Sequence, residues 1–117
     1  MLTVTKIFTF CAAHKLPDHA GQCKNLHGHT YTLEVELIGH LERNGMICDF
    51  GEMSDRVKEI VDKVDHTYLN ETISQPTAEQ ITIWFRDQLS QIYPSKLSRI
   101  RLYESPTSYA EWKKGDR

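Results

Sequence analysis

Two histidines, His27 and His29, stand two positions apart in a stretch that also contains Cys23. Alternate residues of an extended strand point to the same side, so both imidazoles could face one ion. His14, which lies upstream, could supply a third nitrogen. Three histidines with an open position form a catalytic zinc site, whereas a fourth protein ligand closes a structural one. Cys23 could be that fourth ligand, or instead a nucleophile or base.

The hydrophobic pattern predicts the elements that would position these side chains. Alternating apolar residues predict strands over residues 2–14 and 27–37. In both strands the histidines share the parity of the apolar residues, so all three are expected on the inward face of a sheet. Residues 15–25, rich in turn formers, predict a connecting loop that brings Cys23 close to the three imidazoles.

The rest of the chain predicts two helices and a second pair of strands. An Asn-Gly pair predicts a hairpin turn with a returning strand over residues 46–50. Capping residues Asp49 and Thr77 each precede an apolar stripe at helical spacing. Strands are expected over residues 97–104 and 108–113. This order predicts an α+β fold, in which a four-stranded antiparallel sheet carries both helices on one face.

The composition sets mild bounds on the class of protein. The 117 residues suit a single domain, 1–117, with one core. A formal net charge of −2 argues against a nucleic-acid partner or an acidic membrane surface, and no apolar run approaches the roughly 20 residues of a membrane span. Three widely spaced cysteines predict a reducing, cytoplasmic setting. Cys11 and Cys48 are assigned to packing within strands, and His19 and His40 to solvent.

Two further positions combine charge with an unusual place in the pattern. Glu104 shares the inward parity of its strand, and a buried carboxylate needs a partner. That partner could be a lysine or arginine, or a ligand that donates hydrogen bonds. Asp65 and His66 open a predicted loop after the first helix, where His66 could complement the helix dipole or shuttle protons with Asp65. Adjacent residues rarely face each other, so the sequence alone does not show whether these two are in contact.

Several short motifs occur in the order and spacing of one known family. They are Phe-Cys-Ala-Ala-His ending at His14, the stretch from Cys23 to His29, Asp49 with Phe50, Asp65 and His66 followed by Leu69 and Asn70, Pro76 to Glu79, and Glu104. Each alone is weak, but together they span nearly the whole chain and resemble the 6-pyruvoyl-tetrahydropterin synthase family. The compact length is similar to its bacterial branch, 6-carboxy-5,6,7,8-tetrahydropterin synthase.

The resemblance implies a fold, an assembly and a metal. The fold would be the tunnelling fold, with the strand and helix order predicted above. Trimers whose sheets form a barrel would stack into a homohexamer with active sites between subunits. Zinc would be the cofactor, held by His14, His27 and His29.

The same resemblance assigns catalytic and substrate-binding roles. Cys23, as a thiolate, would take a proton from the substrate, and His66 would serve as its relay partner with assistance from Asp65. Glu104 would anchor the pterin by accepting hydrogen bonds from its amino and ring N–H groups. Glu79 could also contact the pterin, although the helix dipole equally explains a glutamate in a first helical turn.

The implied activity is that of a lyase in queuosine biosynthesis. It would convert 7,8-dihydroneopterin triphosphate to 6-carboxytetrahydropterin, acetaldehyde and triphosphate, without nicotinamide or flavin. The alternatives are a 6-pyruvoyl product from triphosphate elimination alone, and a non-catalytic zinc-binding module closed by Cys23. A folate-pathway bypass branch carries glutamate near the Cys23 position, so the cysteine argues against it. Lys15 and Lys24 are candidate triphosphate contacts.

Overall fold

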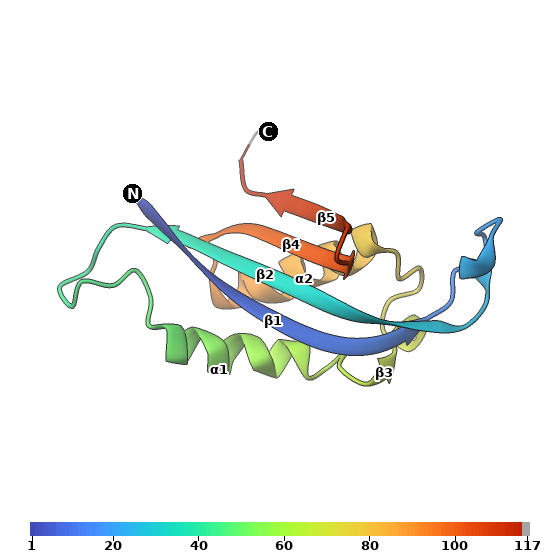
Figure 1. Ribbon diagram of the computed structural model, residues 1–117. Coiled ribbons are helices and arrows are strands. Elements are labelled where there is room, and N and C mark those ends of the chain that lie inside the picture. The colour runs from blue at the N-terminus through green and yellow to red at the C-terminus, as the bar shows by residue number, and fades with distance from the viewer. Residues whose placement is uncertain (116–117) are drawn as a thin grey trace.

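The computed structural model describes residues 1–115, which form a five-stranded sheet and two helices (Figure 1). In chain order the elements are β1 (Leu2–His14), β2 (His27–Gly39), α1 (Phe50–Val61), β3 (Thr67–Tyr68), α2 (Ala78–Ile92), β4 (Leu97–Ser105) and β5 (Ser108–Lys113), with short 3-10 turns at Gln22–Lys24 and Leu69–Glu71. The strand order is β3-β1-β2-β4-β5. The β1–β2 loop forms one end of the molecule (Figure 1).

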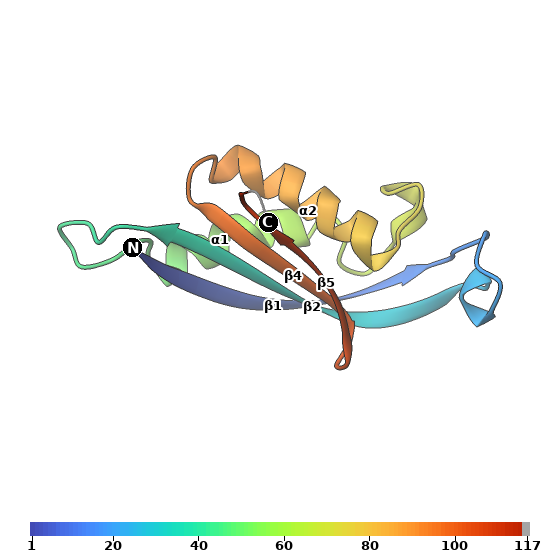
Figure 2. The ribbon, with the colours of Figure 1, turned by 90° about the horizontal axis from the view of Figure 1, so that it is seen from above.

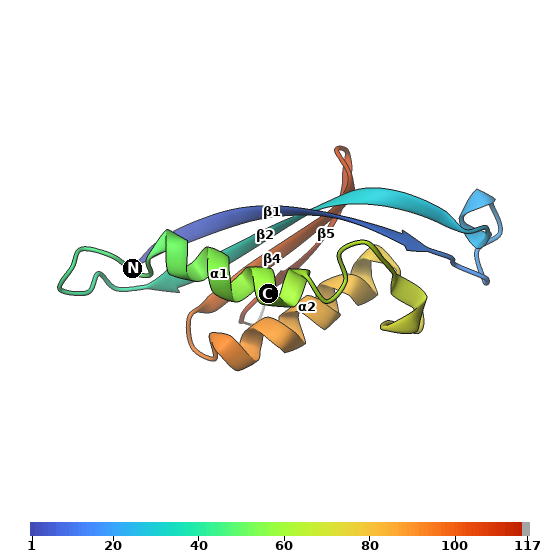
Figure 3. The same cartoon turned by 90° about the horizontal axis from the view of Figure 1, so that it is seen from below.

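Both helices cover the same face of the sheet, so the predicted α+β architecture is confirmed. Leu33 of β2 and Ile100 of β4 are fully buried in one core cluster with Met53 of α1 and Phe85 of α2. Burial of side chains of this size contributes about 1.5–3 kcal/mol each. Figure 2 shows the sheet from above, and Figure 3 shows α1 and α2 lying beneath it.

The two helices begin at the predicted caps. The Asp49 carboxylate accepts a hydrogen bond from the backbone N–H of Glu52 at 2.9 Å, and the Thr77 hydroxyl accepts one from Gln80 at 3.1 Å. Each bond satisfies an N–H that the first helical turn would leave unpaired. Within residues 1–115, no helix is long and apolar enough to cross a bilayer.

The sheet differs from the predicted one in two places. A fifth strand, β3, pairs in parallel with β1 at the sheet edge, so the sheet is mixed rather than wholly antiparallel. The predicted returning strand over residues 46–50 is wrong, because Ile47 and Cys48 form a bend and Phe50 already begins α1. β1 and β4 flank β2, and the N–H of Ile38 donates to the Lys96 carbonyl. No edge of β2 is therefore free for a hairpin partner.

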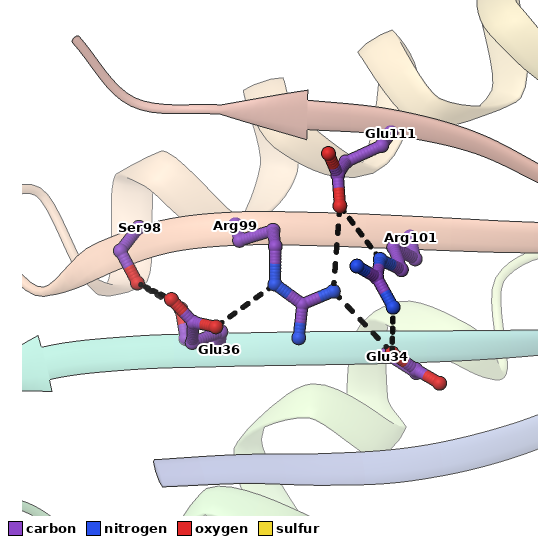
Figure 4. Close-up of polar contacts among 6 residues, drawn as sticks. All are labelled: Glu34, Glu36, Ser98, Arg99, Arg101 and Glu111. Atoms are coloured by element: carbon purple, nitrogen blue, oxygen red, sulfur yellow. Dashed lines mark hydrogen bonds and ion pairs between the residues drawn. The ribbon is translucent and has the colours of Figure 1, made fainter. Parts of the chain in front are cut away.

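The face of the sheet opposite the helices, called here the open face, is polar and includes Cys11, Thr30, Glu34, Glu36, Arg99 and Arg101. Figure 4 shows Arg99 reaching Glu36 on β2 and Glu111 on β5. Burial raises the pKa of Glu36, but hydrogen bonds from Arg99 and Ser98 outweigh it and hold the pKa below its usual value. Ser98 is the extra residue of a bulge opposite Glu36, so these bonds also fix the β2–β4 register.

Candidate metal centre

Three imidazoles meet at the end of the β1–β2 hairpin, as the strand parity predicts. His14 pairs with His27 across the two strands, and His29 is two residues further along β2 on the same face. One ring nitrogen from each residue lies within 4.8 Å of the others. His14 is fully buried, whereas His27 and His29 are half-buried. The cluster therefore lies at the border of the hydrophobic core, and two of its three rings are partly exposed.

Backbone carbonyls fix the protonation of two of the rings. His14 Nδ1 lies 2.7 Å from the Pro76 carbonyl, and His27 Nδ1 lies 2.7 Å from the Asn25 carbonyl. Carbonyl oxygens only accept hydrogen bonds, so both Nδ1 atoms carry the proton and both Nε2 atoms present lone pairs. Such backbone contacts orient histidine ligands in metal sites.

The third ring of the cluster is that of His29. Nε2 of His29 is buried and meets no hydrogen-bond partner within residues 1–115. Burial lowers the pKa of His29 against the opposing effect of the Glu104 carboxylate, and the neighbouring imidazoles lower it further. A neutral imidazole is the metal-binding form. Three imidazole nitrogens that converge in this way fit zinc, and they leave a coordination position open.

Glu104 lies beside the cluster, on the inward side as predicted. Its Oε1 is 3.8 Å from Nε2 of His29, which is too long for a hydrogen bond. The neighbour of this carboxylate is thus an imidazole, and neither lysine nor arginine pairs with it within residues 1–115. One side of Glu104 also faces a cleft of about 560 Å³ between the 15–25 loop, the start of α2 and the β4–β5 hairpin.

This cleft brings together several residues that the sequence singles out. Cys23 and Glu79 line it together with Glu104, and so does the exposed His19, which the sequence assigns to solvent. Cys23 lies in the 3-10 turn of the loop, where its carbonyl accepts a 2.9 Å hydrogen bond from Leu16. Cys23 is not part of the ligand cluster found in residues 1–115, so the structure offers three protein ligands rather than four.

Asp65 and His66 contact each other, a point that the sequence alone leaves open. Asp65 Oδ1 lies 2.9 Å from His66 Nδ1 and accepts a 3.0 Å hydrogen bond from the backbone N–H of Cys11. That hydrogen bond, assisted by His66, lowers the pKa of Asp65 despite partial desolvation. His66 has a φ of 59°, the only positive value for a non-glycine residue within 1–115, and this conformation turns its ring back to Asp65.

The Asp65–His66 pair and Cys23 lie in different places. His66 lines a hollow on the open face, and the lining also includes Cys11, Thr30, Tyr68 and His29 of the histidine cluster. The hollow borders β3 at one edge of the sheet, whereas the cleft borders β5 at the other edge. Within a single chain, Cys23 is therefore not in the same pocket as His66 and Asp65, the residues expected to relay its proton.

Two cysteine assignments change in part. Cys11 lies in β1 but is exposed on the open face, and Cys48 packs against the core as expected but from an irregular segment rather than a strand. Tyr31 is fully buried with its hydroxyl 3.3 Å from His14 Nδ1. Its parity with His27 and His29 could have indicated this neighbour. Nothing in the sequence pattern indicates that the Pro76 carbonyl would reach His14.

The chain is similar to known proteins over nearly its whole length. A model of the 6-pyruvoyl tetrahydropterin synthase family matches residues 3–115. The 6-carboxy-5,6,7,8-tetrahydropterin synthase of Haemophilus influenzae is 35% identical, over 96% of this chain and 99% of that protein. The dihydroneopterin monophosphate aldolase of Pyrococcus furiosus is 34% identical, over 82% and 83% respectively. The solved structure of Caenorhabditis elegans 6-pyruvoyl tetrahydropterin synthase matches with a TM-score of 0.89 and 25% identity, over 97% of this chain and 96% of that one.

Proposed function

Because the chain belongs to the 6-pyruvoyl tetrahydropterin synthase family, we propose that it is a zinc-dependent 6-carboxy-5,6,7,8-tetrahydropterin synthase. Its substrate would be 7,8-dihydroneopterin triphosphate, and its products would be 6-carboxytetrahydropterin, acetaldehyde and triphosphate. The reaction would serve the biosynthesis of queuosine, a 7-deazaguanine base of tRNA. A cytoplasmic location would keep its three free cysteines reduced.

One observation carries the proposal. Three histidine nitrogens converge beside Glu104, and Glu104 in turn faces the cleft that Cys23 lines. Metal ligands, a thiol and a carboxylate are thus within reach of one bound molecule. A purely structural zinc site would be closed by a fourth ligand, and residues 1–115 supply none at this cluster.

The chain's own residues divide the work as follows. Glu104 and, at the start of α2, Glu79 would accept hydrogen bonds from the donor edge of the pterin. Zinc held by the three histidines would supply a Lewis acid that polarises the hydroxyl oxygens of the substrate side chain. Cys23 would then remove a proton from the adjacent carbon as its thiolate. Carboxylates dominate the charged lining of the cleft, so the triphosphate would extend outward, toward Lys15 and Lys24.

The proton relay would be completed by a second copy of the chain. Cys23 lines the cleft and His66 lines the hollow, and no residue is shared between the two linings, so His66 with Asp65 would enter the cleft of a neighbouring subunit. Strands at both edges and a polar open face favour closed assembly of several copies. We therefore include a homohexamer, built as a dimer of trimers, in the proposal.

Product analysis tests the proposed reaction. The zinc-loaded protein is incubated with 7,8-dihydroneopterin triphosphate, and the products are separated and identified. Acetaldehyde together with 6-carboxytetrahydropterin supports the proposal. A 6-pyruvoyl product without acetaldehyde would assign the elimination reaction instead, and turnover of dihydroneopterin monophosphate alone would assign an aldolase. Absence of turnover with every reduced pterin would overturn the enzymatic proposal.

A further inference from the structure

The side chain of Asn70 is attached to the backbone of Lys15 at two points. Its Oδ1 accepts a 2.9 Å hydrogen bond from the Lys15 N–H, and its Nδ2 donates a 2.8 Å hydrogen bond to the Lys15 carbonyl. The two residues are 55 positions apart in the chain. A side-chain amide carries one acceptor and one donor, so it can satisfy both backbone groups of a single residue.

This attachment continues a strand ladder that would otherwise stop. β3 pairs with β1 only at Ala12 and Ala13, and the chain then turns into the 3-10 helix that contains Asn70. On the other side of β1, pairing with β2 ends at His14. Lys15 therefore pairs with neither β2 nor β3. The Asn70 side-chain amide instead makes the two hydrogen bonds that a neighbouring strand would make. Without Asn70, this peptide would be held only through its neighbours in the chain.

Lys15 lies between the two parts of the proposed site. It directly follows His14, whose imidazole is one of the three proposed zinc ligands. The next residue, Leu16, donates its N–H to the Cys23 carbonyl at 2.9 Å. The two hydrogen bonds from Asn70 thus fix the backbone between the proposed ligand His14 and the loop that contains the proposed base, Cys23.

We propose that Asn70 is a positioning residue that sets the place of Cys23 relative to the histidine cluster. Asn70 does not line the cleft, so it acts through the Lys15 and Leu16 backbone. This inference rests on the proposed function for the roles of Cys23 and the metal. The attachment itself is independent of which pterin is the substrate.

Two substitutions and a matched control separate positioning from folding. Asn70→Ala removes both bonds, whereas Asn70→Asp keeps the size and the acceptor but offers no donor to the Lys15 carbonyl. Asn44→Ala is the control, because Asn44 Oδ1 also accepts a backbone hydrogen bond, from Met46 at 3.0 Å, in the turn between β2 and α1. Thermal unfolding of all three variants reports any general loss of stability.

The decisive measurements do not depend on turnover alone. Zinc affinity is measured by chelator competition, and alkylation of Cys23 by iodoacetamide is followed by peptide mass spectrometry, which separates it from Cys11 and Cys48. Both Asn70 variants are expected to change the alkylation rate, and to lower zinc affinity and kcat by about 10- to 100-fold with KM little changed. Asn44→Ala should match the wild type in every readout.

Three results would overturn the proposal. The first is wild-type zinc affinity and a wild-type Cys23 alkylation rate in folded Asn70 variants. The second is an equal effect of Asn44→Ala on these readouts. The third is unfolding of both Asn70 variants, which would show that Asn70 is needed for folding rather than for positioning Cys23. If the wild-type protein turns over no reduced pterin, the proposed function fails. Zinc affinity and Cys23 alkylation still decide the role of Asn70 in that case.

Discussion

The Nε2 atoms of His14 and His27 lie 2.9 Å apart, and in neutral rings that donate through Nδ1 neither Nε2 atom carries a proton. Each ring donates its Nδ1–H to a backbone carbonyl, of Pro76 and of Asn25. Two lone pairs at this distance repel each other unless a cation or a proton lies between them. Nε2 of His29 faces the same space without a partner in residues 1–115. The fold thus holds together a donor set that a metal ion would complete.

Removal of one ligand should abolish tight metal binding. His29→Ala is expected to lower zinc affinity by about 100-fold or more, because two histidines remain where three would share the ion. Zinc should therefore raise the unfolding temperature of the wild type but not of the variant. His40→Ala, which changes an exposed histidine outside the cluster, is the control. Equal zinc affinities for wild type and His29→Ala would place the metal elsewhere.

The Asp65 carboxylate should make stability depend on acidity. Hydrogen bonding to the Cys11 N–H, assisted by His66, lowers its pKa in the folded state. A carboxylate of this kind stabilises the fold above its ordinary pKa and loses that contribution as the pH falls through its folded value. We expect Asp65→Asn to unfold at a lower temperature than wild type at neutral pH, with the difference shrinking below about pH 4. A difference that is constant with pH would contradict this role.

Mixed assemblies should show whether the relay crosses between copies. Cys23→Ala and His66→Ala should each be nearly inactive. When both variants are co-expressed, some sites would combine an intact Cys23 from one copy with an intact His66 from another. Random mixing predicts about a quarter of wild-type turnover in such hybrids. Hybrids no more active than either variant would place both residues in one subunit's site.

The Arg99 guanidinium should stabilise the open face. Its side chain is 11% exposed and bridges carboxylates on β2 and β5 (Figure 4). Arg99→Met would leave Glu36 without an arginine, whereas Glu34 and Glu111 would keep Arg101, and we expect a loss of about 2–4 kcal/mol in unfolding free energy by urea titration. Arg86→Met should cost less than about 0.5 kcal/mol, because Arg86 pairs with Asp87 in solvent. Similar losses of unfolding free energy in the two variants would show that the Arg99 ion pairs do not stabilise the open face.

Sequence patterns predict the parts of the site that lie on long regular elements. Strand alternation places His14, His27 and Glu104 on the inward face, because one face of the sheet must be buried beneath the helices. Helix caps are equally readable, since Asp49 and Thr77 bond to N–H groups only three residues away. These features depend on local geometry.

The missed features depend on contacts between distant segments. β3 has two residues, which is too short for alternation to appear, and its position beside β1 is set by the chain that follows α1. The contact between Asp65 and His66 requires a positive φ that a histidine gives no reason to expect. Asn70 reaches Lys15 across 55 residues, so no local pattern encodes the pair.

If the metal ligands and the proton-accepting thiol are separate groups, Cys23→Ala should remove the base and leave the metal site intact. The purified variant is assayed for zinc content, unfolding temperature and turnover of 7,8-dihydroneopterin triphosphate, with Cys48→Ala as the control thiol. We predict that Cys23→Ala keeps its zinc and its fold and loses turnover, while Cys48→Ala keeps all three. Loss of zinc from Cys23→Ala would make this thiol a metal ligand, and turnover at the wild-type rate would exclude it as the base, so either result would refute the proposed separation.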